Sequence, residues 1–265
     1  MIIWQLVCSP RCPRPAEQGH RGEHTSYLLS ILAMNIFKQF QQLFQTEPSP
    51  EAVAKQLRQP SGLLARRVGN KMNETNAPLY DFALREMNLA DGDQLLEIGF
   101  GNGNFFKTLF AAANNLRISG LDFSKDMVQA ALENNEARIK SGDLSLSLGS
   151  SDGMLFADAT FDKIFCINVI YFWETAAEHL KEIQRVLKPG GRFYAIIRSK
   201  ETLQMMPFTQ FGFKLYEVEE WCNILQENGF SNLRVATKSE SPFEYQGKQF
   251  QLASICISSE LAAKP

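Results

Sequence analysis

Three glycines at alternate positions follow an apolar run and form the sharpest chemical signal in the sequence. The run spans residues 95–98, and Gly99, Gly101 and Gly103 follow it, with an amphipathic helical pattern directly behind. Such a turn lets the backbone approach a ligand closely and points free helix N–H groups at an anion, although the same spacing also makes a plain tight turn. The dinucleotide fingerprint GxGxxG needs a glycine where this chain has Asn104, which argues against a nicotinamide cofactor.

An acidic residue ends the next apolar run. Asp122 occupies the tip of the second predicted strand, where a carboxylate accepts hydrogen bonds from both ribose hydroxyls of an adenosine. Phe123 and Met127 beside it offer apolar surface for a purine. The alternative is that Asp122 only caps the helix that begins near Ser124. Together with the glycine turn, Asp122 favours a site for an adenosine cofactor.

The elements that must position these groups alternate between strands and helices. Beyond residue 92, short apolar runs alternate with amphipathic segments, which is typical of a parallel sheet with crossover helices. Residues 34–87 are helical in pattern, and Asn76 and Pro78 predict the start of the last of three or four short helices there. Residues 199–213 are expected to be irregular. The predicted strands are 94–98, 116–122, 144–149, 163–168, 191–198, 232–238 and 249–258.

The composition excludes several kinds of partner. The 265 residues are 45% apolar, which is enough to fill the core of one large α/β domain. The 27 Lys and Arg are balanced by 29 Asp and Glu, so nucleic acid is not expected as a main partner. No apolar stretch approaches the roughly 18 residues of a membrane span, so no stable membrane insertion is expected. Five scattered cysteines indicate a reducing compartment, and we expect a cytoplasmic location.

The first 33 residues differ in composition from the rest. They hold four residues of zinc-ligand types, but the spacings are too compressed for a known zinc finger, so no metal site is predicted. We expect residues 1–33 to be a disordered or non-native tail, and Met34 is a candidate true start. Residues 34–90 then form an N-terminal helical extension or lid, and residues 91–265 form the main domain. The four residues are Cys8, Cys12, His20 and His24.

At this point the chain resembles a class I S-adenosylmethionine (SAM)-dependent methyltransferase. The resemblance covers about residues 60–258. Two of its sequence blocks, the third and fourth of those given below, look most like the small-molecule methyltransferases related to ubiquinone and menaquinone C-methyltransferases. The resemblance implies a Rossmann-like, doubly wound, mostly parallel seven-stranded sheet with an antiparallel last strand, helices on both faces and an N-terminal helical lid. The blocks that carry it are LLEIGFGNG, GLDFSKDM, GSSDGMLFADATFDKIFCINVIYFW and EIQRVLKPGGRFYAII.

The resemblance implies that SAM is the cofactor and assigns residues to it. The glycine turn would line the methionyl part, Glu97 would lie near the cofactor's amino group, and Asp122 would hold the ribose. Relatives often carry an aspartate where this chain has Ser150, so adenine recognition is expected to shift towards Ser151 and Asp152. The complete predicted cofactor set is Glu97, Gly99, Gly101, Asn102, Gly103, Asp122, Phe123, Met127, Ser150, Ser151, Asp152 and Asn168.

The sequence evidence for the acceptor site and for a catalytic group is weaker than that for the cofactor site. Aromatic and thioether residues follow the fourth and fifth predicted strands, which favours an apolar or aromatic acceptor, although each cluster could equally be ordinary core. His179 is the only histidine outside the tail and is the candidate general base. The alternative is a structural role, which is more common for a histidine at a helix border. A base is also not required, because in-line methyl transfer can be accelerated by orientation of the reactants alone. The alternative function is a SAM-binding regulatory or interaction protein without turnover. The predicted acceptor contacts are Tyr171, Trp173, Met206 and Phe208.

Overall fold

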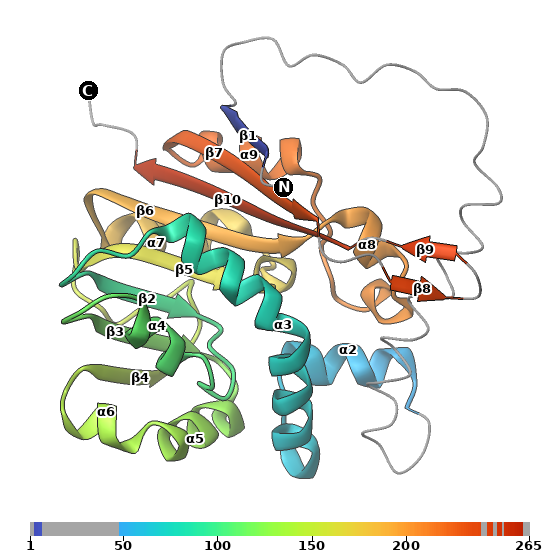
Figure 1. The fold of residues 1–265 in the computed structure, drawn as a ribbon, viewed down its shortest axis with the longest axis horizontal. Coiled ribbons are helices and arrows are strands. Elements are labelled where there is room, and N and C mark those ends of the chain that lie inside the picture. Colours follow the sequence, from blue (N-terminus) through green and yellow to red (C-terminus); the bar gives the residue numbers. More distant parts are fainter. Residues whose placement is uncertain (1–2, 7–47, 240–242, 246–247, 251, 262–265) are drawn as a thin grey trace.

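A mostly parallel sheet forms the centre of the computed structural model (Figure 1), which describes residues 3–6, 48–239, 243–245, 248–250 and 252–261. The strand β2 (Gln94–Ile98) lies in the interior of this sheet and is buried on both faces, as the apolar residues Leu95, Leu96 and Ile98 require. Four neighbours run parallel to β2 or to one another, whereas β10 is antiparallel to β6 and to β7. The predicted seven-stranded sheet with an antiparallel last strand is therefore confirmed. In spatial order its strands are β4 (Leu144–Leu148), β3 (Arg117–Asp122), β2 (Gln94–Ile98), β5 (Phe161–Ile167), β6 (Leu187–Arg198), β10 (Ala253–Leu261) and β7 (Phe230–Ser239).

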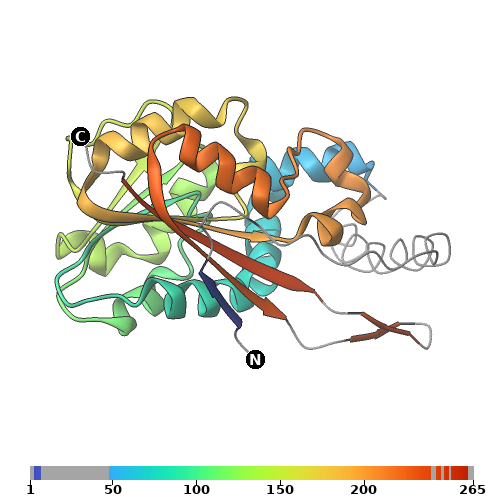
Figure 2. The ribbon, with the colours of Figure 1, turned by 90° about the horizontal axis from the view of Figure 1, so that it is seen from above.

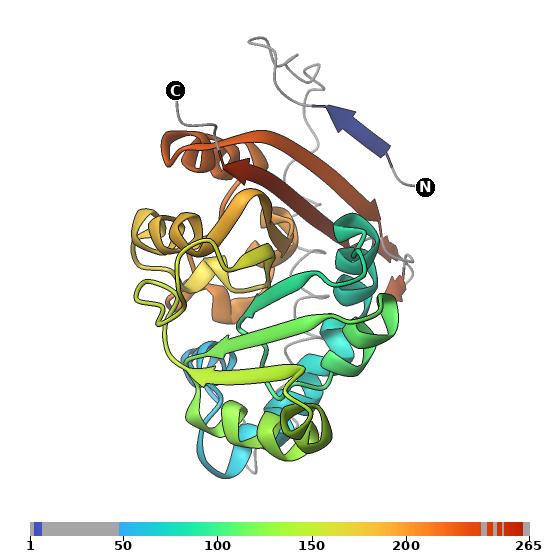
Figure 3. The same cartoon turned by 90° about the vertical axis from the view of Figure 1, so that its left-hand side faces the viewer.

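An eighth strand, β1 (Ile3–Leu6), extends this sheet. It pairs antiparallel with the outer side of β7, with Ile3 opposite Thr237 in register (Figure 3). These four residues lie in the segment 1–33, whose composition predicted a tail. The four residues of zinc-ligand types and Met34 lie outside the described residues, and the predicted domain boundaries stay predictions.

Helices cover both faces of the sheet, as predicted. On one face lie α3, α4 and α5, and on the other lie α7 and α9 (Figure 2). Ser124 caps α5 by accepting a hydrogen bond from the backbone of Met127, and a capping box between Glu217 and Glu220 begins α9. Each face buries its own apolar cluster against the strands. The helices are α3 (Ala65–Met87), α4 (Phe106–Ala112), α5 (Lys125–Asn134), α6 (Glu136–Lys140), α7 (Ala176–Val186) and α9 (Val218–Glu227).

The helix α3 corrects one prediction. It is continuous from Ala65 to Met87 and contains Pro78 in its interior, so the predicted helix start at Asn76 is wrong. A proline removes one backbone donor and crowds the preceding turn, which normally favours a break. Here Arg198 Nη2 donates a hydrogen bond to the carbonyl of Thr75 at 3.1 Å, and the residues after the proline are buried in the core. Tertiary packing outweighs the local cost, and the two halves of α3 serve different parts of the molecule.

Two further stretches differ from the predictions. The segment expected to be irregular holds α8 (Lys200–Gln204), capped by Ser199, and the 3-10 helix η3 (Pro207–Gln210). The last strand begins at Ala253 rather than at residue 249, because the preceding residues form a separate hairpin (Figure 2). That hairpin consists of β8 (Phe243–Tyr245) and β9 (Lys248–Phe250).

The N-terminal helices close one end of the sheet. α2 (Pro50–Arg58) packs against η3, where Val53 and Ala54 meet Met206 and Phe208 in a small buried cluster. The connection after α2 is hydrogen-bonded to the turn that follows β3: Ser124 Oγ donates to the carbonyl of Pro60 at 2.6 Å. α2 and the first half of α3 therefore form the expected helical cover over the carboxyl ends of the strands.

Candidate cofactor and acceptor site

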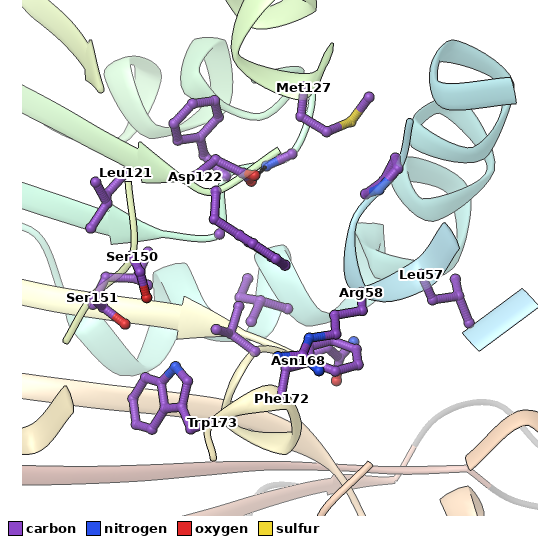
Figure 4. Close-up of a pocket in the computed structure, with 18 of the residues that line it drawn as sticks. Leu57, Arg58, Leu121, Asp122, Met127, Ser150, Ser151, Asn168, Phe172 and Trp173 are labelled. Atoms are coloured by element: carbon purple, nitrogen blue, oxygen red, sulfur yellow. Dashed lines mark hydrogen bonds between the residues drawn. The ribbon is translucent and has the colours of Figure 1, made fainter. Parts of the chain in front are cut away.

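A cavity of about 330 Å³ lies at the carboxyl ends of β2, β3 and β5 (Figure 4). The strand ends and the loops behind them line it from one side, and α2 and α3 line it from the other. Parallel α/β sheets bind ligands at this edge because the strand ends diverge there and leave a crevice. The whole predicted cofactor set contributes to the lining except Glu97 and Gly103.

The glycine turn after β2 has the conformation that its sequence predicts. Gly99, Gly101 and Gly103 all have positive φ, at 77°, 60° and 68°. A Cβ atom on Gly99 would lie 2.4 Å from a methyl group of Val169, and one on Gly103 would lie 2.8 Å from Ala131, so tight packing excludes side chains there. A Cβ atom on Gly101 would meet no atom within 4 Å. At this point the backbone is open to the cavity and available to a ligand.

Asp122 lies directly beside this turn. Its Oδ2 accepts a hydrogen bond from the backbone N–H of Gly101 and its Oδ1 accepts one from Ser124, each at 2.8 Å. Burial raises the pKa of the carboxyl to about 6, although both hydrogen bonds favour the ionised form. Each carboxylate oxygen has a further lone pair, so both can still accept from ribose hydroxyls. The capping and ribose-binding interpretations of Asp122 are therefore compatible.

Glu97 is buried beneath the cavity rather than exposed in it. Tyr80 Oη donates a hydrogen bond to Glu97 Oε1, and the Tyr80 ring stacks on Phe105 with ring centroids 3.7 Å apart. Burial raises the pKa of Glu97 to about 8; the Tyr80 hydrogen bond lowers it, and the nearby charge of Asp122 raises it. Tyr80 itself lines the cavity, whereas Glu97 does not. The predicted contact of Glu97 with the cofactor's amino group stays a prediction.

No residue of α3 was among the predicted site residues. Gly69, Met72, Asn73, Asn76 and Tyr80 all line the cavity, and their spacing places them on one face of the helix. The polar residues of this stripe at i, i+3 and i+7 were the available signal. Without knowledge of how α3 docks, that signal cannot be distinguished from a solvated face.

Asparagines connect α3 to the rest of the site. Asn168 has a left-handed backbone at the end of β5, and its Nδ2 donates to Asn76 Oδ1 at 3.0 Å. Asn102 Nδ2 donates to Asn70 Oδ1 at 3.2 Å. These bonds hold α3 against the glycine turn and against β5, so the predicted residues Asn102 and Asn168 line a cavity whose opposite wall they also fix.

One of the three residues predicted to recognise adenine already has a hydrogen-bond partner within the protein. Ser150 and Asp152 are exposed at the cavity, whereas Ser151 is buried and its Oγ lies 2.8 Å from His179 Nδ1. The His179 ring stacks on Trp173 with centroids 4.6 Å apart and an interplanar angle of 10°. Burial lowers the pKa of His179, and the charge of Asp152 raises it. The imidazole is thus a stacked group with one nitrogen occupied, and burial favours its neutral form.

The predicted acceptor contacts fall into two groups. Trp173 lines the cavity, but Tyr171 is buried and its hydroxyl donates to Asn168 Oδ1 and accepts from the backbone N–H of Arg198. Met206 and Phe208 pack against α2 instead of lining the cavity. Contact of these residues with an acceptor stays a prediction, and the structure shows Met206 and Phe208 as supports of the cover. Leu57 and Met72 line the cavity with apolar side chains from the cover side, and Phe172, in the 3-10 helix η2 (Ile170–Phe172), lines it from the loop after β5.

The charge of the cavity suits a cationic ligand. Four of its described lining residues are acidic and one is basic. Within the described part of the chain, no cluster of three or more metal-ligating side chains is present. SAM carries a sulfonium and an ammonium group, so acidic walls, the open backbone at Gly101 and the carboxylate of Asp122 fit it. The acidic residues are Asp122, Asp152, Glu174 and Glu178.

Comparison with known proteins agrees with this geometry. Residues 96–195 match the family described as the methyltransferase domain. The uncharacterized methyltransferase YdaC of Bacillus subtilis is 26% identical over 133 residues, which cover 50% of this chain and 71% of YdaC. The ubiquinone/menaquinone biosynthesis C-methyltransferase UbiE of Geotalea daltonii is 29% identical over 139 residues, covering 46% of this chain and 59% of UbiE. The chain thus spans about three fifths of the length of such quinone-pathway relatives.

Solved structures share the fold. The complex between the Haloferax volcanii Trm112 methyltransferase activator and a methyltransferase contains a chain that superimposes with a TM-score of 0.61 at 20% identity. That match covers 76% of this chain and 95% of the other. A SAM-dependent methyltransferase from Aquifex aeolicus superimposes with a TM-score of 0.53 at 18% identity, covering 81% and 100% of the two chains.

The sheet order, the glycine turn and the carboxylate at the tip of β3 define a Rossmann-like domain that binds an adenosine cofactor. With the matched family, the assignment becomes specific. Residues 96–195 form a methyltransferase domain of the class I SAM-dependent type, and the chain is a distant homologue of the UbiE group and of other small-molecule methyltransferases. SAM is the methyl donor of this family.

Proposed function

We propose that this protein transfers the methyl group of SAM to a small-molecule acceptor, apolar or aromatic in its body, by in-line displacement. The observation that carries the proposal is that one cavity joins the cofactor-binding groups to an apolar cover. Gly101, Asp122 and Phe172 lie on the strand side, and Leu57 and Met72 lie on the helical side. Two reactants can therefore be held against each other in a single cavity.

The chain's own residues would act mainly by binding and orientation. Asp122 accepts hydrogen bonds from the ribose, and the backbone at Gly101 approaches the methionyl end. Tyr80 presents its ring above Glu97, while α2 and α3 keep water from the reacting atoms. When bound, SAM supplies an electrophilic methyl group on a positively charged sulfur.

No general base is needed in this proposal. The Nδ1 of His179 is occupied by Ser151, and its ring is stacked on Trp173. Orientation of the two reactants contributes on the order of 7 to 11 kcal/mol in well-aligned intramolecular reactions, which is a large part of the barrier to methyl transfer. We therefore propose that His179 and Ser151 support the cavity wall and that placement does the catalytic work.

A cytoplasmic location belongs to the same proposal. Cys166 and Cys256 are buried free thiols, which supports a reducing compartment. Among the described helices, none is long and apolar enough to cross a bilayer.

The test has two stages. Titration calorimetry should show binding of SAM and of S-adenosylhomocysteine, with no binding of nicotinamide dinucleotides. Transfer of a radiolabelled methyl group from SAM to a library of small aromatic and aliphatic acceptors should then identify turnover. Cofactor binding with no transfer to any acceptor would instead favour a SAM-binding regulatory protein, and absence of cofactor binding would contradict both functions.

A further inference from the structure

Arg58 is the single Lys or Arg that the described residues contribute to the cavity wall. It is the last residue of α2, and its Nη2 lies 3.6 Å from Glu174 Oε1. The Arg58 side chain is 40% exposed and that of Glu174 is 86% exposed, so this contact contributes little to stability. Within the described part of the chain, the guanidinium makes no hydrogen bond. Its planar set of N–H donors is therefore available to a ligand.

A second polar group of the helical cover also has no hydrogen-bond partner among the described residues. Asn73, on the cavity face of α3, has a half-buried carboxamide that makes no hydrogen bond to the described residues. Its neighbours in the stripe differ, because Asn76 is bonded to Asn168 and Tyr80 is bonded to Glu97. Leaving polar groups without partners in a half-closed cavity costs free energy unless a ligand or water satisfies them.

These two groups belong to the cover rather than to the strand ends. In Figure 4 Arg58 and Leu57 enter the cavity from the helical side, opposite Ser150 and Ser151. The groups predicted to hold the cofactor, by contrast, follow β2, β3, β4 and β5. The cover therefore combines apolar side chains with one guanidinium and one free carboxamide, which is a donor-rich surface for a second molecule.

We propose that Arg58 binds an anionic oxygen group of the methyl acceptor, so that the acceptor is an acid with an apolar body; this inference rests on the proposed methyl transfer. A guanidinium matches a carboxylate in a bidentate geometry, which a lysine or an amide cannot reproduce. An incoming carboxylate would displace only the exposed Glu174 from Arg58. Asp152 and Glu178 repel an acid elsewhere along the wall, so Arg58 also fixes which end of the acceptor enters first.

The test compares acids with their primary amides, which share shape but lack the charge. The probes are naphthoate and naphthamide, hydrocinnamate and hydrocinnamide, and octanoate and octanamide, titrated by ligand-observed NMR into full-length protein saturated with S-adenosylhomocysteine. At least one acid should bind about tenfold or more tightly than its amide. Arg58→Gln should remove that difference, and Arg58→Lys should restore only part of it. Every variant should retain its affinity for S-adenosylhomocysteine within about threefold.

Arg66→Gln is the matched control. Arg66 lies at the start of α3, its side chain is 71% exposed, and it pairs with Glu133 away from the cavity. This variant should retain the full preference for the acid.

Two results would overturn the inference. One is a set of probes in which no acid binds better than its amide. The other is a loss of tenfold or more in S-adenosylhomocysteine affinity on Arg58→Gln, which would assign the guanidinium to the carboxylate of the cofactor. Either result leaves the proposed methyl transfer intact, because label transfer from SAM to a neutral acceptor is measured separately.

Discussion

Replacing Glu97 by glutamine should change how stability depends on pH. Glu97 is 1% exposed and bonded to Tyr80, and burial raises its pKa from 4.5 to about 8. The unfolded chain releases this proton near pH 4.5, whereas the folded chain retains it until about pH 8. The contribution of Glu97 to stability is therefore fully present below pH 4.5 and is lost as the pH rises towards 8. Glutamine keeps an oxygen for the Tyr80 hydrogen bond and never ionises.

The size of this stability difference follows from the shift in the pKa of Glu97. Each pH unit inside this window is worth about 1.4 kcal/mol, so the wild type should lose up to about 4 kcal/mol relative to Glu97→Gln between roughly pH 5 and pH 8. Urea unfolding of both proteins at each pH measures the difference, and the midpoint should move while the slope stays the same. Titrating groups that do not interact with Glu97 cancel in this comparison because both proteins share them.

A control and a refuting result complete this prediction. Glu136→Gln removes a carboxylate whose side chain is 70% exposed and pairs with Lys140 on α6, and it should give a pH-independent difference from the wild type. If the difference between the wild type and Glu97→Gln stayed constant from about pH 5 to pH 8, Glu97 would be ionised throughout, and the burial argument would be wrong.

Four other outcomes follow from the site. Asp122→Ala should weaken SAM at least about tenfold in calorimetry, because charged hydrogen bonds contribute about 1.5 to 3 kcal/mol each; unchanged affinity would refute the ribose assignment. Gly103→Ala should lower the melting temperature more than Gly101→Ala, because only the former places a Cβ atom 2.8 Å from its neighbours; equal losses would contradict the packing argument. His179→Ala should keep turnover within about tenfold, and abolished turnover with intact cofactor binding would make His179 the general base. A chain that begins at Met34 should retain its cofactor affinity, because β1 pairs with β7 and does not line the cavity, and weakened binding would show a role for the first 33 residues.

Much of the fold could be predicted from residues that are close together in the sequence. The strands before the glycine turn and before Asp122 were predictable because a short apolar run bounded by glycine or an acid has few other stable conformations. The serine cap of α5 and the glycine turn are equally local, since each is fixed by residues within a few positions of one another. Pro78 shows where such reasoning fails: its local preference for a helix start is outweighed by the buried residues of α3 that follow it.

The sequence by itself thus determined the class of fold, the cofactor turn and the acid at the tip of β3, because each depends on neighbours in the chain. Only the tertiary structure decided the other wall of the cavity. Arg58 and Asn73 reach it because α2 and α3 dock across the strand ends, and Tyr80 finds Glu97 across that same contact. Nothing in the spacing of these residues fixes that docking, because it arises from buried surfaces far apart in the chain, such as the contact of Phe208 with α2.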